Sequence, residues 1–429
     1  MTVSAIENPA LVDDLERQLA HWLAAARTFR DAEEFASSEA WRSVERQIGA
    51  PLRQQLNTIV EELISLGEAA GRLIAVSRSD PGQVAKAQSA VQTFRRRYIQ
   101  VDTTLDYIGD AVNSRTSPLL RIALSNLDRL AVDSMTSVLA RAGKPIPRVL
   151  VYQDKGTGAS ILRAGVRLWV PGAVMPVAAI KIVRHNLYRP TSLFHETGHQ
   201  VAHLTNWVPS VRKCLESALA GDRELQTMWT AWAPEIAADV YAFLHTGYAS
   251  VAALYDVVGD INTILRWPVG DPHPVGWLRT ALGCAFSAFC FGTKGPWVSL
   301  MGAMRAHHPL ERAEPTLQPL LARSMEAIER IAAACLTAPV PALDGRPMTS
   351  VLAPARVSPA ALKDLERTAG PALWTSAHWR MTEGIRIVAL AGLREAERPA
   401  TATDWINRAR TWLTMEPQHQ RTLRELSNA

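Results

Sequence analysis

The sequence predicts a mostly helical α+β protein with a small antiparallel sheet near the middle of the chain. Apolar residues recur at helical spacing up to about residue 143 and again after residue 190. Between these regions lie three short segments rich in Val, Ile and Leu, separated by turn residues, which is typical of strands. This order predicts an N-terminal helical bundle, a central core that contains the sheet, and C-terminal helices.

The N-terminal region has apolar stripes that fit helices packed as a bundle. One stripe steps in threes and fours through residues 11–29, and a second does so through residues 52–66. Prolines stand where these helices would start or stop, because a proline ring is tolerated only in the first turn of a helix. They are Pro9, Pro51, Pro81 and Pro118.

The three predicted strands cover residues 148–153, 160–170 and 177–183. The middle one alternates apolar residues with polar or small ones, which predicts a sheet with one buried face. At 429 residues the chain exceeds the usual size of a single hydrophobic core, so several domains are expected. We predict an N-terminal helical domain at 1–143, a central domain at 144–310, and a C-terminal helical region at 311–429. The Pro-rich segment at 338–359 is predicted to be a linker or an extended wrap along the surface.

Composition and charge exclude several classes of protein. The net charge of +5 comes from 46 basic and 41 acidic residues that are interspersed, so nucleic-acid binding is not indicated. The four cysteines show no C-x-x-C spacing, which predicts reduced core residues. The N-terminus lacks a signal-peptide pattern, and the longest apolar stretch, residues 281–292, is shorter than the roughly 20 residues of a membrane helix. We therefore expect a cytoplasmic protein without a membrane anchor.

One motif contains candidate metal-binding and catalytic residues: His195-Glu196-Thr197-Gly198-His199. Pro190 and the two hydroxyl residues after it predict a helix start, which places the motif inside a helix. Residues four apart lie on one helix face, so His195 and His199 can bind one zinc ion. Glu196 projects beside that face, where it can take a proton from a metal-activated water.

A zinc hydrolase needs a third protein ligand, and Glu235 is the candidate. It opens a second predicted helix, where Asp239 follows one turn later on the same face. Asp239 can then accept the free N–H of a zinc-bound imidazole and fix its orientation. His203 is the alternative third ligand, because it continues the face of His195 and His199.

The pattern H-E-x-x-H followed by E-x-x-x-D resembles the gluzincin clan of zinc metallopeptidases, over about residues 148–279. The resemblance implies a zincin-like catalytic core, zinc bound by His195, His199 and Glu235, and Glu196 as general base. It also implies that Asp239 supports a zinc-binding histidine.

Residues 273–279 resemble the H-P-x4-R element of the gluzincin branch that contains CAAX prenyl proteases and bacterial heat-shock membrane proteases. The resemblance implies that His273 donates a hydrogen bond to the reaction oxyanion. A loop histidine that only caps the next helix is the alternative, and Arg279 is expected in a structural ion pair. The chain lacks the membrane spans of that branch.

These observations predict a zinc-dependent metallopeptidase that acts on peptide or protein substrates. The strand at 177–183, which ends near His185, is the expected pairing partner for an extended substrate. Two alternatives stay open: a scaffold or binding protein with a structural or vestigial zinc site, and a zinc hydrolase of a non-peptide amide. The long helical regions also offer surfaces for a protein partner or for self-association.

Overall fold

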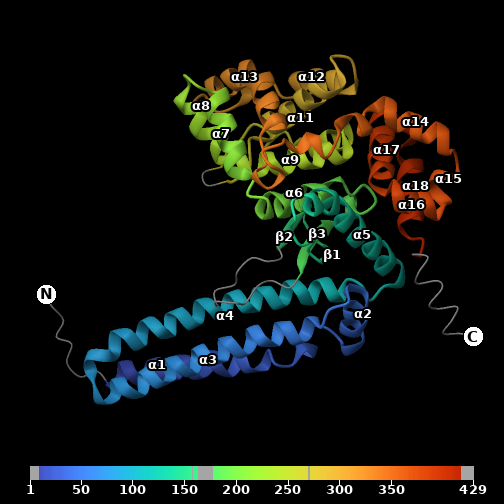
Figure 1. The fold of residues 1–429 in the computed structure, drawn as a ribbon. Helices are drawn as coiled ribbons and strands as arrows, with labels where there is room; N and C mark the ends of the chain where they lie inside the picture. Colours follow the sequence, from blue (N-terminus) through green and yellow to red (C-terminus); the bar gives the residue numbers. More distant parts are fainter. Residues whose placement is uncertain (1–8, 157, 163–176, 269–270, 417–429) are drawn as a thin grey trace, which may run out of the picture. The chain divides into compact units, whose positions relative to one another are not determined.

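The computed structural model describes residues 9–156, 158–162, 177–268 and 271–416. The described chain is mostly helical with one small mixed sheet, which confirms the predicted fold class (Figure 1). The chain divides into two compact units, and helix α5 (Pro118–Arg141) belongs to the second of them. This division by contacts does not test the boundaries predicted near residues 143 and 310, which stay predictions.

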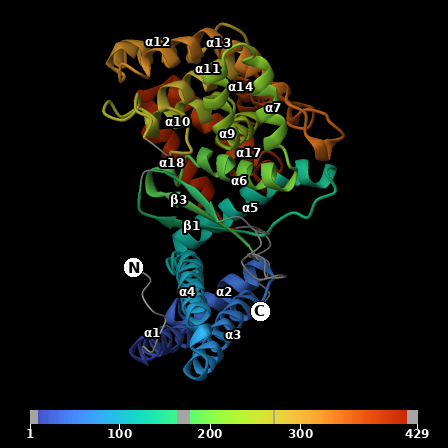
Figure 2. The same cartoon turned by 90° about the vertical axis from the view of Figure 1, so that its left-hand side faces the viewer.

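The first unit contains the predicted helical bundle. Three long helices lie side by side (Figures 1 and 2), and their contact face holds the apolar stripes. Gly67 allows the close approach, because a Cβ atom there would lie 2.8 Å from Leu23 and 3.0 Å from Phe94. The helices of this unit are α1 (Pro9–Thr28), α2 (Ser38–Ile48), α3 (Leu52–Ser79) and α4 (Val84–Asn113).

The sheet has the strand order β1-β3-β2. Its strands are β1 (Val149–Asp154), β2 (Ser160–Leu162) and β3 (Ala178–Val183). The sheet is mixed instead of antiparallel, and residues 163–170 of the predicted middle strand lie outside the described residues. Among the described strands, β3 is central and β1 and β2 are at the edges. Edge strands have free ladder groups, so this order favours β1 or β2 over β3 for pairing with an extended substrate. Which strand pairs with a substrate stays a prediction.

The second unit is built around the contact between α6 (Thr191–Leu204) and α9 (Ala233–Thr246), which lie side by side (Figure 2). Helix α5 packs on α6, while α10 (Tyr248–Val258) and α11 (Gly276–Phe291) pack on α9. The remaining helices are α7 (Val208–Ala218), α8 (Arg223–Ala231), α12 (Pro296–His307), α13 (Gln318–Thr337), α14 (Pro359–Ala369), α15 (Ala372–Thr375), α16 (Ala377–Thr382), α17 (Gly384–Glu397) and α18 (Ala402–Leu413).

The Pro-rich segment at 338–359 packs against this unit instead of forming a free connection. It contains three short 3-10 turns, and Val340 and Met348 within it are fully buried. Gly247, between α9 and α10, lies against the Val357 carbonyl, which a Cβ atom on Gly247 would meet at 2.5 Å. Burial of these apolar side chains fixes the segment in place.

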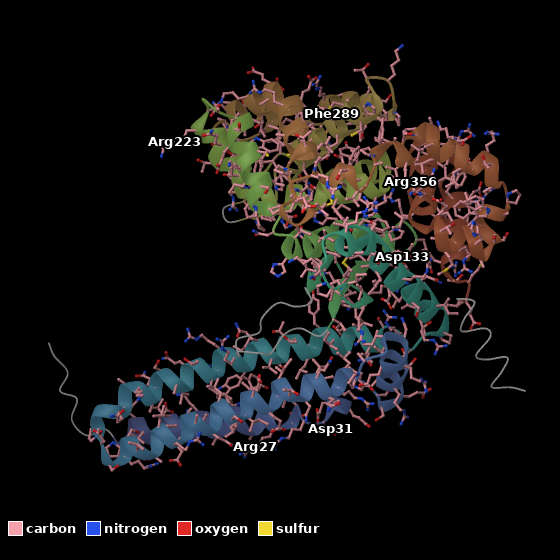
Figure 3. All side chains as sticks on the ribbon, viewed as in Figure 1. Arg27, Asp31, Asp133, Arg223, Phe289 and Arg356 are labelled. Atoms are coloured by element: carbon pink, nitrogen blue, oxygen red, sulfur yellow. The ribbon has the colours of Figure 1, made fainter. Side chains whose placement is uncertain are left out.

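Surface and cysteine features agree with the composition. Exposed ion pairs occur in both units, for example Arg30 with Glu61 in the first and Arg323 with Glu224 in the second. Figure 3 shows the side chains on the ribbon. All four cysteines are free. Within the described ranges, no helix combines the length and apolar character that crossing a membrane requires.

Candidate metal centre

Helix α6 presents two histidine side chains toward one point. His195 and His199 are one helical turn apart, and their Nε2 atoms lie 3.1 Å from each other. The two imidazole rings stand nearly perpendicular, with an interplanar angle of 86°. Two ring nitrogens this close can share one proton or one metal ion, since each neutral imidazole offers a lone pair.

Helix α9 supplies a carboxylate to the same point. Glu235 lies in its first turn, after Pro234, and is 8% exposed. Its Oε2 atom is 3.3 Å from His195 Nε2, and its Oε1 atom is 3.4 Å from His199 Nε2. One ligand atom from each of the three residues falls within 4.8 Å of the others, so the group could hold a metal ion.

The two helices come this close because Gly198 faces Ala238. A Cβ atom on Gly198 would lie 2.9 Å from the Ala238 Cα atom and 3.0 Å from the Tyr241 Cβ atom. The glycine inside the histidine motif thus sets the spacing that brings Glu235 to His195 and His199. Behind this contact, Tyr241 donates a hydrogen bond of 2.6 Å to the Ser134 carbonyl of α5.

Replacing Gly198 with alanine is expected to destabilise the protein by about 1–3 kcal/mol, the usual cost of overpacking a filled contact. The clash is with backbone atoms of α9, so the helices must separate, and metal affinity should fall as well. Denaturant unfolding and metal titration would measure the two effects. The matched control is Gly302→Ala in α12, where a Cβ atom meets nothing within 4 Å. That change should be neutral or stabilising by up to roughly 1 kcal/mol, and equal destabilisation by both variants would contradict the spacing role.

The nitrogen and oxygen atoms of the three residues lie at separations that suit a small metal ion. Nitrogen and oxygen ligands about 2.0–2.1 Å from zinc, for example, are about 3.3–3.4 Å from one another in a tetrahedron. The two Nε2 atoms are 3.1 Å apart, His195 Nε2 is 3.3 Å from Glu235 Oε2, and His199 Nε2 is 3.4 Å from the other carboxylate oxygen, Oε1. In addition, the buried Glu235 Oε2 atom accepts no hydrogen bond of good geometry among the described residues, although His195 Nε2 and Arg279 lie 3.3 and 3.5 Å from it. A bound cation would satisfy this oxygen.

Asp239 and Arg279 hold His195 from the side opposite the ligand atoms. The Asp239 Oδ1 atom lies 2.8 Å from His195 Nδ1, and the Arg279 guanidinium donates to both Asp239 oxygens at 2.6 and 2.8 Å. This pairing leaves Nε2 as the nitrogen that faces Glu235. The expected ion pair of Arg279 is thus present, and it joins α11 to the ligand helices.

The charged groups at the centre are two carboxylates, Glu235 and Asp239, and two basic groups, His195 and Arg279. Burial opposes the charged form of His195, but the charge and hydrogen bond of Asp239 outweigh it and raise the pKa of His195 to about 10. Burial and the charge of His195 lower the pKa of His199 to about 3, so only one histidine is protonated at neutral pH. For Glu235, burial is outweighed by His195 and Arg279, and its pKa is lowered to about 2. The carboxylates of Glu235 and Asp239 therefore stay ionised beside the histidines.

Glu196 lies beside the ligand atoms but is not one of them. It is 5% exposed and lines the same cavity as His195. Burial is the main cause that raises its pKa to about 7. A carboxylate with a pKa near neutrality suits the transfer of protons, because it can both accept and release one.

His273 reaches the centre from the loop before α11. It is more exposed than the ligands, and its Nε2 atom is 3.6 Å from Glu235 Oε2. Asp271 Oδ1 orients His273 through two contacts. The backbone N–H of His273 donates to it at 2.9 Å, and His273 Nδ1 lies 2.7 Å from it. The ring thus points its Nε2 atom toward the ligand carboxylate instead of only capping the next helix.

A cavity of about 580 Å³ opens at this centre. His195, Glu196 and His273 line one end of it. Asn186, just after β3, and Ser192, at the start of α6, also line it, although the sequence suggested no role for either. Their only sequence signal is their position just before the motif.

The structure does not bring the alternative ligand to the centre. His203 is exposed near the end of α6 and is outside the His195, His199 and Glu235 group. The tyrosines that follow Glu235 do not reach it either. As far as the structure describes the cavity, it is lined by none of Tyr241, Tyr248 and Tyr255.

Comparisons with known proteins leave the chain without an assigned family. A scan against protein-family models, a search of curated proteins and a search of solved structures each found no match.

Proposed function

We propose that the protein is a zinc-dependent hydrolase of peptide bonds. The observation that carries the proposal is the convergence of His195, His199 and Glu235 on one point, with the buried carboxylate of Glu196 in the same cavity. A metal site alone serves structure as well as catalysis. A closed structural site has four protein ligands, whereas three ligands beside a cavity leave one position open.

Zinc fits the donor set best, because two imidazoles and one carboxylate are a ligand combination of catalytic zinc sites. Bound there, zinc would activate a water molecule and polarise the carbonyl under attack. The gluzincin resemblance of the motifs supports the same donor set and the same general base.

The remaining residues have distinct roles in this proposal. Glu196 takes the proton of the attacking water and delivers it to the leaving amine. Asp239 keeps His195 in the tautomer that presents Nε2, and Arg279 holds Asp239 in place. His273 is the candidate hydrogen-bond donor to the carbonyl oxygen as negative charge develops on it.

An extended substrate can approach along the edge of the sheet. Strand β2 is an edge strand, and Gly158 and Ala159 just before it line the cavity. Backbone groups of a bound peptide could therefore pair with β2 while its scissile bond lies at Glu196.

Metal analysis and a hydrolysis assay test the proposal together. Protein purified without chelator is expected to contain about one zinc per chain, and to cleave members of a mixed peptide library at rates that fall when a chelator removes the metal. A zinc content near zero would refute the assignment. One zinc per chain with no hydrolysis of any peptide or amide would instead favour the scaffold protein with a structural metal.

A further inference from the structure

The cavity continues well beyond the residues that carry the proposed chemistry. Along α9 its lining passes from Asp239 to Ala242 and Phe243, and along α11 from Arg279 to Phe286. The seven helical steps from residue 279 to residue 286 correspond to roughly 10 Å of helix. This extension, which we call the apolar arm, leads away from the polar end at His195.

Helix α10 closes the apolar arm. Val251, Leu254 and Val257 line it from α10, and Gly283 lines it from α11, which packs directly against α10 at this point. Gly283 is required there, because a Cβ atom would lie 2.9 Å from the Val251 side chain. Leu254 is only partly buried, and it faces the space of the arm.

The cavity is too large for a single small side chain. Its 580 Å³ is several times the roughly 150 Å³ that truncation of one buried leucine opens in a protein core. Part of this volume lies at the polar end, where the reacting bond would sit. The remainder, about 10 Å long, is lined mainly by aliphatic and aromatic side chains, with Ser250 of α10 among them. It suits an extended chain of roughly eight carbons.

Two buried polar atoms of residues that line the cavity have no hydrogen-bond partner among the described residues. The Asn186 Oδ1 atom and the Ser192 Oγ atom are buried and form no hydrogen bond among the described residues, and both residues line the cavity. Asn186 is only 2% exposed. Such groups cost free energy unless a ligand supplies the missing partner, and an amide N–H would do so for Asn186.

We propose that the cleaved amide carries a linear apolar chain of roughly eight carbons that fills the apolar arm, while Asn186 and Ser192 bind the polar part of the substrate. This inference rests on the proposed function. Water adds across the amide: the C–N bond breaks, the carbonyl carbon gains the hydroxyl oxygen, and the nitrogen gains the proton carried by Glu196. The products are a carboxylic acid and an amine, one of which retains the chain.

Binding of the products tests the apolar arm without catalysis. Straight-chain alkanoic acids and alkylamines of four to twelve carbons would compete with a fluorescent fatty acid for the full-length protein, with and without prior chelator treatment. We expect the Kd of one series to fall about threefold to fourfold per methylene and to level off near eight carbons. The series that shows this dependence identifies the side of the amide that bears the chain.

Leu254→Phe should weaken binding of the eight-carbon ligand at least tenfold and change that of the four-carbon ligand less than about twofold, because only the longer chain reaches position 254. The matched control is Leu119→Phe in α5, at an exposed site outside the cavity. If Leu254→Phe does not fold, Leu254→Ala serves instead and should move the plateau to longer chains.

The outcomes separate this inference from the proposed function. If the protein binds no zinc but its affinity for one ligand series depends on chain length, the metal hydrolase is refuted and the apolar arm is supported. Zinc-dependent hydrolysis at rates that do not differ between acetyl and octanoyl amides, nor between N-methyl and N-octyl amides, would overturn the apolar arm and keep the hydrolase. Affinity that is independent of chain length, or equal effects of the two Leu→Phe variants, would also overturn it.

Discussion

The variant Glu196→Gln is expected to lose hydrolysis by a factor of about 10²–10⁴ in kcat, the usual contribution of a general acid–base group. Glutamine keeps the size of the side chain but cannot take a proton from water. Glu196 is not among the three converging ligands, so zinc content should stay near that of the wild type. Burial of a neutral amide in place of a carboxylate also costs less, so stability should not decrease.

Steady-state kinetics and metal analysis on the same preparation would measure both effects. The matched control is Glu216→Gln on the exposed surface of α7, which should leave both values unchanged. Loss of zinc together with activity in Glu196→Gln would contradict the separation of base and ligand. Full activity of Glu196→Gln would show that Glu196 is not the general base.

The second large effect is expected from Glu235→Ala, which removes one of three protein ligands. Structural zinc sites bind with about 10–16 kcal/mol, so loss of one ligand should cost on the order of 3–4 kcal/mol, or roughly 10²–10³-fold in zinc affinity. Asp239→Asn should cost less, roughly 10–100-fold, because it supports His195 without contacting the ion. Competition with a chromophoric chelator would give both affinities.

The informative result is which of the two variants loses more zinc affinity. An affinity loss greater for Asp239→Asn than for Glu235→Ala would contradict the assignment of Glu235 as ligand. Unchanged zinc affinity in Glu235→Ala would indicate that His203, and not Glu235, is the third ligand. His203→Ala serves as the control, since this exposed histidine lies outside the converging group and its replacement should leave zinc affinity intact.

The helical part of the site could be predicted from the sequence because it depends on local geometry. A spacing of four residues places His195 and His199 on one face of any helix, and the same holds for Glu235 and Asp239. The apolar stripes of the N-terminal region likewise predicted the long helices that the structure contains. These features involve residues within a few turns of each other, so they need no knowledge of the rest of the chain.

Other features depend on which segments pack together, and only the tertiary structure decided them. The sequence does not determine the order of the strands, so it did not reveal that β3 is central and that β1 and β2 are the edge strands. Contact between Gly198 and Ala238 sets how close α6 and α9 come. The partners of Asp239, the unpaired oxygen of Asn186 and the apolar arm likewise arise where helices distant in sequence meet. Side-chain periodicity records which face of a helix is buried, but not which surface it is buried against.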